Sequence, residues 1–230
     1  MATVLLVRHG RTSANTEGIL AGRTPGTHLD DVGVEQVRSL AQEIAGVRPT
    51  AVIASPLERT VQTAELIAQA ISAQGGPVIK VAHESGLVEC DYGDWTGKSL
   101  SDLAEDSLWR AVQDHPSAVK FPGESGEAMA SMQSRAVASI RSWNDLLGPE
   151  ALYIAVSHGD VIKSIIADAL GVHLDNFQRI VVDPGSLSVI RYSELRPFVL
   201  SVNGDGSKIH RFMNESKKTE SDAAVGGGSA

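Results

Sequence analysis

Histidine and arginine recur in this sequence directly after short apolar runs. Arg8-His9-Gly10 follows VLLV, and Ser157-His158-Gly159 follows YIAV. A third apolar run, AVIA, is followed by Ser55 and, a few residues later, by Arg59. The planar fork of arginine pairs well with phosphate oxygens, and histidine adds a further donor. These residue types favour a pocket for a compact dianion such as a phosphoryl group, provided that the fold brings them together.

The apolar runs before these residues are predicted to be strands of one sheet. Short apolar runs alternate with longer amphipathic segments along the chain, which is typical of an α/β fold with helices on both faces of the sheet. The connections after parallel strands emerge at one edge of the sheet, and ligands bind in the crevice there. We therefore expect the two arginines and the two histidines to meet at that edge.

The predicted strands are short and mostly rich in β-branched residues. Helices are predicted where apolar residues recur at helical spacing, within residues 34–44, 61–71, 129–147 and 162–170. Turn residues between the last apolar runs predict antiparallel strands at the end of the sheet. The predicted fold is a three-layer α/β/α sandwich with a mainly parallel central sheet. Its strands are expected at VLLV (4–7), AVIA (51–54), VIKVA (78–82), YIAV (153–156), IVV (180–182), SLSVIRY (186–192) and FVLSVN (198–203).

One domain is predicted for residues 1–213, because 230 residues with 42% hydrophobic content can bury a sizeable core. Residues 94–125 are long enough to form a cap over the site. The polar, glycine-rich residues 214–230 are expected to be disordered, and we assign them no function. The apolar pattern leaves the oligomeric state open, because it does not distinguish core from interface.

Charge and cysteine content exclude several classes of function. The formal net charge of -8 argues against nucleic acid or an anionic membrane as the partner. Cys90 is the single cysteine and no Cys/His spacing resembles a zinc site, so we expect no internal disulfide, no metal and no cofactor. The N-terminal apolar stretch is short and lacks a preceding charged region, and no later segment could span a bilayer. We therefore expect a cytoplasmic protein.

Each candidate residue also has an ordinary structural explanation. A single histidine at a strand end is usually structural, and an arginine in the first turn of a helix is usually solvated. Recurrence at equivalent strand ends distinguishes His9 and His158, whereas Cys90 is interpreted as a packing residue. The histidines without such a pattern are His28, His83, His115, His173 and His210.

Five stretches of the sequence resemble the histidine phosphatase superfamily, also called phosphoglycerate-mutase-like. They are VLLVRHGRTSAN, SPLERTVQTAELI, LVECDYGDWTG, FPGESGEAM and VSHGDVIKSI, which occur in the family's order and cover nearly everything before the tail. The resemblance implies that His9 is a nucleophile that becomes phosphorylated, and that Ser125 lines the pocket. It also implies that the phosphoryl group is bound by Arg8, Asn15, Arg59, His158 and Gly159.

The chemistry of these residue types agrees with the implied roles. Burial of His9 beside Arg8 and Arg59 should disfavour the imidazolium and keep one ring nitrogen free for attack. Fixed guanidinium donors would stabilise the phosphoryl oxygens throughout the transfer. The leaving oxygen still needs a proton.

The motif LVECDYGDWTG contains the proton donor that the resemblance implies, Glu89. Poor solvation and the charge of a bound phosphate would raise the pKa of this carboxyl. It could then protonate the leaving oxygen and later accept a proton from the water that cleaves phosphohistidine. Glu84 and Asp91 are nearby alternatives, but Glu89 is the residue that matches the family pattern.

The same motif favours a phosphatase over a mutase. Mutases of the superfamily read E-R-H-Y-G here, whereas this sequence has Cys90 and Asp91 in place of the two cationic residues that help to hold a substrate carboxylate. The segment from Glu89 to His158 also looks shorter than in mutases, leaving less chain to keep water away from phosphohistidine. We expect a metal-independent phosphomonoester hydrolase that acts on a small phosphorylated metabolite.

Three alternatives stay open. The first is a phosphotransferase of the phosphoglycerate mutase type. The second is a protein phosphohistidine phosphatase, although such enzymes tend to be smaller and less roofed, and here the segment around Trp109 favours a small molecule. The third is a non-catalytic phosphate-binding module, which would usually have lost His9, Glu89 or an arginine. The sequence does not identify the substrate.

Overall fold

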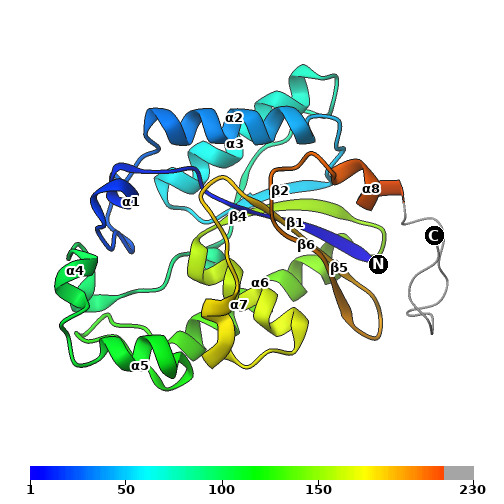
Figure 1. Cartoon of the computed structure of the whole chain (residues 1–230). Coiled ribbons are helices and arrows are strands. Elements are labelled where there is room, and N and C mark those ends of the chain that lie inside the picture. Colours follow the sequence, from blue (N-terminus) through cyan, green and yellow to red (C-terminus); the bar gives the residue numbers. More distant parts are fainter. Residues whose placement is uncertain (215–230) are drawn as a thin grey trace.

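The computed structural model describes residues 1–214 and contains a six-stranded sheet between two layers of helices (Figure 1). The strand order is β3-β2-β4-β1-β5-β6. The first four strands in this order run parallel to one another, β5 is antiparallel to β1, and β6 is antiparallel to β5. The predicted α/β class, the mainly parallel sheet and its antiparallel end are confirmed. The strands are β1 (Ala2–Arg8), β2 (Ala51–Ala54), β3 (Ala82–His83), β4 (Leu152–Ser157), β5 (Leu187–Tyr192) and β6 (Pro197–Gly204).

Two pairs of helices cover the two faces of the sheet, α2 with α3 on one face and α6 with α7 on the other (Figure 1). Val37 and Ile67 belong to the hydrophobic cluster under the first pair, and Met132 and Ile162 to the separate cluster under the second. The helices are α1 (Ser13–Glu17), α2 (Asp31–Ile44), α3 (Glu58–Ala73), α4 (Leu100–Leu103), α5 (Trp109–Asp114), α6 (Met129–Leu147), α7 (Gly159–Leu170) and α8 (Ile209–Asn214), with short 3-10 helices at Ser85–Leu87, Gly93–Trp95, Pro116–Ala118 and Leu174–Arg179.

The register of β1 against β4 positions the two key histidines. These neighbouring strands are parallel, and Arg8 at the end of β1 lies opposite Ser157 at the end of β4. The residues that follow, His9 and His158, therefore leave the sheet side by side at its carboxyl edge. This pairing is the structural basis of the convergence that the repeated pattern predicts.

Two of the predicted strands are wrong. Of VIKVA (78–82), only Ala82 belongs to β3, because the run approaches the sheet at its outer edge and Val78 is 91% exposed. The run IVV (180–182) follows the 3-10 helix Leu174–Arg179 and pairs with no strand of the sheet. The side chains of Ile180 and Val182 instead pack into the cluster under α6 and α7, while Val181 is exposed. Apolar character in this run reflects packing against helices.

The expected cap segment, residues 94–125, contains short helices and a group of aromatic side chains. Trp95 is buried and packs against Trp109 and Phe121, with ring centroids 6.2 and 5.5 Å away. Helix α8 includes Asn214, the first residue of the expected tail, and the rest of that expectation lies outside the described residues. Within residues 1–214, none of the helices has the length and apolar character needed to cross a bilayer.

Candidate active site

His9 lies just beyond the carboxyl end of β1 and is almost completely buried, with 4% of its surface exposed. Its backbone N–H donates to the carbonyl of Ser157 at 3.1 Å, which fixes the turn after the strand. The ring nitrogen Nδ1 lies 2.7 Å from the carbonyl oxygen of Gly10. Because that oxygen can only accept, we assign the ring proton to Nδ1. Nε2 is thereby left with its lone pair, as a nucleophile requires.

Arg59 links the two histidines. Its Nε donates to Nε2 of His9 at 3.2 Å, and its Nη2 lies 3.1 Å from Nδ1 of His158. The residue sits in the first turn of α3, is 2% exposed, and also donates from Nη2 to the carbonyl of Gly22 at 2.8 Å. With the guanidinium held in this way, the two imidazole rings lie 5.3 Å apart between centroids.

His158 follows β4 and is fully buried. Since the Arg59 guanidinium is a donor, Nδ1 of His158 accepts, and Nε2 carries the proton that it donates to Oγ of Ser55 at 2.8 Å. Ser55 follows β2, so the hydrogen-bonded chain spans the ends of three neighbouring strands. The sequence pattern marks the position of Ser55 after a strand, but it does not indicate that this hydroxyl orients a histidine.

At this edge of the sheet, two buried guanidinium nitrogens have no hydrogen-bond partner within the described residues, Nη1 of Arg59 and Nε of Arg8. Arg8 is anchored by a bond from its Nη1 to the carbonyl of Val182 at 2.6 Å. Buried N–H groups are rarely left unpaired in proteins. These donors are therefore suited to bind the oxygens of an anion at the edge of the sheet.

Burial keeps both histidines neutral. It lowers the pKa of His9 and of His158 well below the ordinary histidine value, and the charge of Arg59 lowers both further. The charge of Arg8 acts in the same direction on both rings. At neutral pH, Nε2 of His9 is thus available for attack without a prior deprotonation.

Glu89 lies in the loop that follows the 3-10 helix Ser85–Leu87, and it is 8% exposed. Its Oε1 accepts a hydrogen bond from the N–H of Cys90 at 3.0 Å. Burial raises the pKa of Glu89 to about 7, the charge of Asp160 adds to this effect, and the charge of Arg59 opposes it. A carboxyl with such a pKa can serve as an acid and as a base near neutral pH.

Comparison with known proteins identifies the family. The pattern of the histidine phosphatase superfamily (branch 1) matches residues 4–205. The chain belongs to this superfamily. Phosphoserine phosphatase 1 of Hydrogenobacter thermophilus is 30% identical over 210 residues, which cover 88% of this chain and 92% of the relative. A probable phosphoglycerate mutase GpmB of Salmonella paratyphi C is 30% identical over 201 residues, which cover 84% and 86% of the two chains.

Solved structures agree with this result. The crystal structure of a putative alpha-ribazole-5'-P phosphatase from Escherichia coli is 25% identical, with a TM-score of 0.76, and the match covers 89% of this chain and 97% of that one. The predicted phosphoglycerate-mutase-like fold is confirmed. The expectation that the chain is a phosphatase of the histidine phosphatase superfamily is confirmed as well.

The superfamily resemblance also implies substrate-binding roles for Gly159, Asn15 and Ser125, of which the first lies beside Arg8 and the other two are exposed. Gly159 begins α7 beside Arg8, and a side chain there would bring its Cβ to 3.3 Å from Cζ of that arginine. Asn15 is exposed on α1, and its Oδ1 accepts from the N–H and the hydroxyl of Thr12, both at 3.0 Å. Ser125 is exposed and donates to Oδ1 of Asp91 at 3.2 Å. The roles of Asn15 and Ser125 stay predictions.

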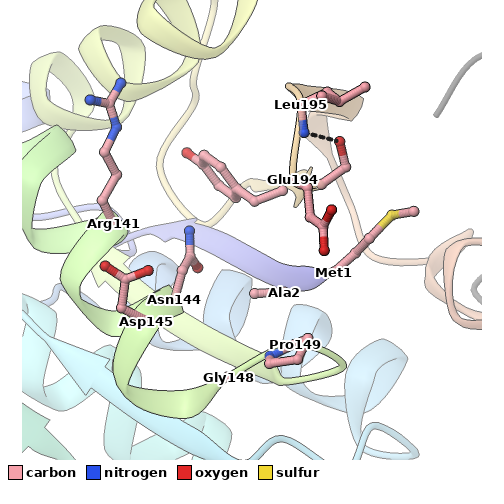
Figure 2. Close-up of a pocket in the computed structure, with 11 residues that line it drawn as sticks. Met1, Ala2, Arg141, Asn144, Asp145, Gly148, Pro149, Glu194 and Leu195 are labelled. Atoms are coloured by element: carbon pink, nitrogen blue, oxygen red, sulfur yellow. Dashed lines mark hydrogen bonds between the residues drawn. The ribbon is translucent and has the colours of Figure 1, made fainter.

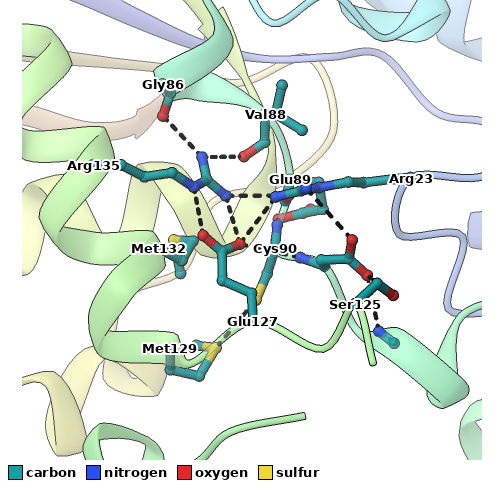
Figure 3. A network of polar contacts seen from close by, with 12 residues as sticks. Arg23, Gly86, Val88, Glu89, Cys90, Ser125, Glu127, Met129, Met132 and Arg135 are labelled. Carbon is teal, nitrogen blue, oxygen red and sulfur yellow. Dashed lines mark hydrogen bonds and ion pairs between the residues drawn. The ribbon is translucent and has the colours of Figure 1, made fainter. Parts of the chain in front are cut away.

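Sequence reasoning missed a polar network around the backbone of Glu89, shown in Figure 3. Arg23 and Arg135 both donate to the Glu89 carbonyl, at 2.8 and 3.2 Å, and both form ion pairs with Glu127. Glu127 lies in the stretch FPGESGEAM, but no spacing or periodicity in the sequence indicates that it pairs with Arg23 and Arg135. Among the described residues, no three His, Cys, Asp or Glu side chains gather into a group that could hold a metal ion.

A cavity of about 830 Å³ lies elsewhere on the molecule (Figure 2). It is lined by Met1 and Ala2 at the start of β1, by the end of α6 and by the turn after β5. His9 follows the other end of β1, roughly 20 Å away for a strand of this length. The cavity is lined by none of the candidate site residues and is separate from the candidate active site.

Proposed function

We propose that this protein is a metal-independent phosphomonoester hydrolase that acts through a phosphohistidine on His9, with a small phosphorylated metabolite of the cytoplasm as substrate. The observation that carries the proposal is the arrangement of His9 and Arg59. The nucleophilic Nε2 lies 3.2 Å from a guanidinium nitrogen, and the same guanidinium has a second, unpartnered buried nitrogen. A phosphoryl group bound to these donors has its phosphorus next to Nε2.

In the first half-reaction, Nε2 of His9 attacks phosphorus while the bond from phosphorus to the ester oxygen breaks. Glu89 gives its proton to that oxygen, and the alcohol leaves. The bond from Nδ1–H of His9 to the Gly10 carbonyl, 2.7 Å long, stabilises the positive charge that develops on the ring. Arg8 and Arg59 surround the transferred oxygens and stabilise their charge, while the His158 ring accepts from Arg59 and holds that guanidinium in place.

In the second half-reaction, Glu89 is ionised and takes a proton from water, whose oxygen attacks phosphorus. The bond between phosphorus and Nε2 breaks, inorganic phosphate leaves, and His9 and Glu89 return to their starting states. The pKa of Glu89, about 7, suits both steps, because neither protonation state is strongly favoured near neutral pH.

A mutase reaction is the second candidate, because one relative is named as a probable phosphoglycerate mutase. The residues beside Glu89 favour the hydrolase. Cys90 is buried and contacts Sδ of Met129, and Asp91 is paired with Arg23. Neither side chain offers a free positive charge for the carboxylate of phosphoglycerate.

The test is rapid quenching with a phosphate monoester labelled at phosphorus. We expect an acid-labile phosphoenzyme and release of inorganic phosphate with the parent protein, and no label in His9→Ala. His158→Ala should still be labelled, but roughly 100-fold more slowly, because Arg59 loses the ring nitrogen that orients its guanidinium. His173→Ala, at an exposed histidine, is the matched control. Equal labelling of His9→Ala and the parent would contradict the assignment, and transfer of the label to phosphoglycerate without release would favour the mutase.

A further inference from the structure

Three side chains from distant parts of the chain hold the loop that carries Glu89 (Figure 3). We call Arg23, Glu127 and Arg135 the acid-loop brace. Arg135, on α6, donates from Nη1 to the carbonyls of Gly86 and Val88, at 2.9 and 2.7 Å, and from Nη2 to that of Glu89 at 3.2 Å. One guanidinium thus fixes three backbone carbonyls within four consecutive residues.

The other two members complete this framework. Arg23 reaches the same Glu89 carbonyl from Nε at 2.8 Å. Glu127 pairs with Nε of Arg135 at 2.7 Å and with Nη2 of Arg23 at 3.0 Å, and it also accepts from the N–H of Asp91 at 3.2 Å. The carboxylate therefore joins both arginines to the backbone on the far side of Glu89.

The loop needs such external support because its own secondary structure is minimal. Between β3 and α4 the chain forms only two three-residue 3-10 helices, Ser85–Leu87 and Gly93–Trp95, and Glu89 lies between them. The carbonyls of Gly86, Val88 and Glu89 are bonded to arginine side chains. The pair of Glu127 and Arg135 is well shielded, since their side chains are 15% and 23% exposed, whereas that of Arg23 is 36% exposed.

We propose that the acid-loop brace is a positioning device for the proton donor, with Arg135 as its central member. Arg135, Glu127 and Arg23 hold the Glu89 backbone so that its carboxyl reaches the leaving oxygen. This inference rests on the proposed role of Glu89 as the acid. A displacement of about 1 Å in a reacting group can cost roughly 100-fold in rate, so a loosened loop should impair proton donation specifically.

Within residues 1–214, the brace side chains form no direct hydrogen bond with the phosphoryl-binding residues, and the nearest links are the bond from Arg59 to the Gly22 carbonyl and that from Ser157 to the Leu87 carbonyl. His9 and His158 are fixed by strand ends, by Arg59 and by Ser55. Arg8 is fixed by the carbonyl of Val182. Loss of the brace should therefore spare phosphoryl transfer itself, and it should matter only where the leaving group needs a proton.

The test compares kcat/KM for two substrates, glycerol 2-phosphate, whose alkoxide must be protonated, and p-nitrophenyl phosphate, whose leaving group departs as an anion. We expect Arg135→Lys to lose about 100-fold on the alkyl ester and less than about threefold on the aryl ester, because lysine cannot reproduce the planar set of donors. Arg141→Lys is the matched control. It lies on the same helix, pairs with Asp168 at 3.0 Å, and should leave both values unchanged.

A purely structural role would lower both values together, and equal losses on the two substrates, or no loss on the alkyl ester, would overturn the inference. If circular dichroism shows that Arg135→Lys does not fold, Arg23→Lys is measured in its place, with an expected loss of about tenfold on the alkyl ester alone.

Glu89→Gln is measured with the same two substrates. If the parent is inactive, or if Glu89→Gln shows no preference for the aryl ester, the proposed function fails. If Glu89→Gln shows the preference and the brace variants do not, only the brace fails.

Discussion

Replacing Glu89 by glutamine should make the stability of the protein less dependent on pH. Burial raises the pKa of this carboxyl from an ordinary value of 4.5 to about 7. Between these values the folded protein holds a proton that the unfolded chain has released, so the free energy of unfolding falls as pH rises. The contribution is fully present below pH 4.5 and is lost as pH passes through 7. Glutamine has no such proton.

The size of the effect follows from the two pKa values. Ionising the buried carboxyl costs about 3 kcal/mol between roughly pH 4.5 and pH 8, at 1.36 kcal/mol for each tenfold change in proton affinity. The hydrogen bond from the Cys90 N–H to Oε1, 3.0 Å long, can be kept by the glutamine oxygen. The comparison therefore isolates the charge, and about 3 kcal/mol corresponds to roughly 6 to 12 °C in Tm for a chain of this size.

The assay is urea unfolding of the parent and of Glu89→Gln at several pH values between 4.5 and 8. The stability of the variant relative to the parent should increase by about 3 kcal/mol from the lowest to the highest pH. Glu65→Gln, at an exposed position of α3, measures the effect of the amide itself. A difference that is independent of pH, or one that decreases as pH rises, would refute the assignment of a buried carboxyl with a raised pKa.

Two further predictions concern the reaction. Asp160→Asn should lower the pKa of Glu89, because the charge of Asp160 helps to raise it, so the alkaline limb of kcat/KM for an alkyl phosphate should move to lower pH. A shift to higher pH in the pH–rate profile would show that another group dominates. Dialysis against EDTA should leave kcat within about twofold of its starting value in a p-nitrophenyl phosphate assay, since imidazole and guanidinium groups supply the catalytic charge. Loss of activity that a divalent ion restores would contradict this expectation.

The convergence of the phosphoryl-binding residues could be predicted because it depends on strand ends. Parallel strands with a shared register bring His9 and His158 to one edge, and Arg59 lies in the first turn of α3, which follows the neighbouring parallel strand β2. A local pattern in the sequence is enough to indicate such an arrangement. The roles of individual atoms, such as the bond from His158 to Ser55, depend on side-chain geometry that no spacing specifies.

The acid-loop brace could not be predicted for a different physical reason. Arg23 comes from an irregular loop, Glu127 precedes α6, and Arg135 lies within that helix. Their meeting depends on how residues 84–93 fold back on the sheet, and an irregular loop has no periodicity from which to infer its path. The error at IVV (180–182) has a related cause, because an apolar run that packs against helices looks the same in sequence as a buried strand.

Because the two hydrophobic clusters are separate, protein engineering can change one face of the sheet without changing the packing of the other. Trp95 and Phe121, which flank the short helices α4 and α5, belong to the cluster on the α6 and α7 face. The helix that carries Arg59 belongs to the other. Residues 100–118 contribute Leu103 and Val112 to the cluster on the α6 and α7 face, so changes at their exposed positions leave the packing beneath α3 untouched. A graft or library confined to exposed positions of this stretch would change the segment expected to cap the site while the helix that carries Arg59 keeps its own packing.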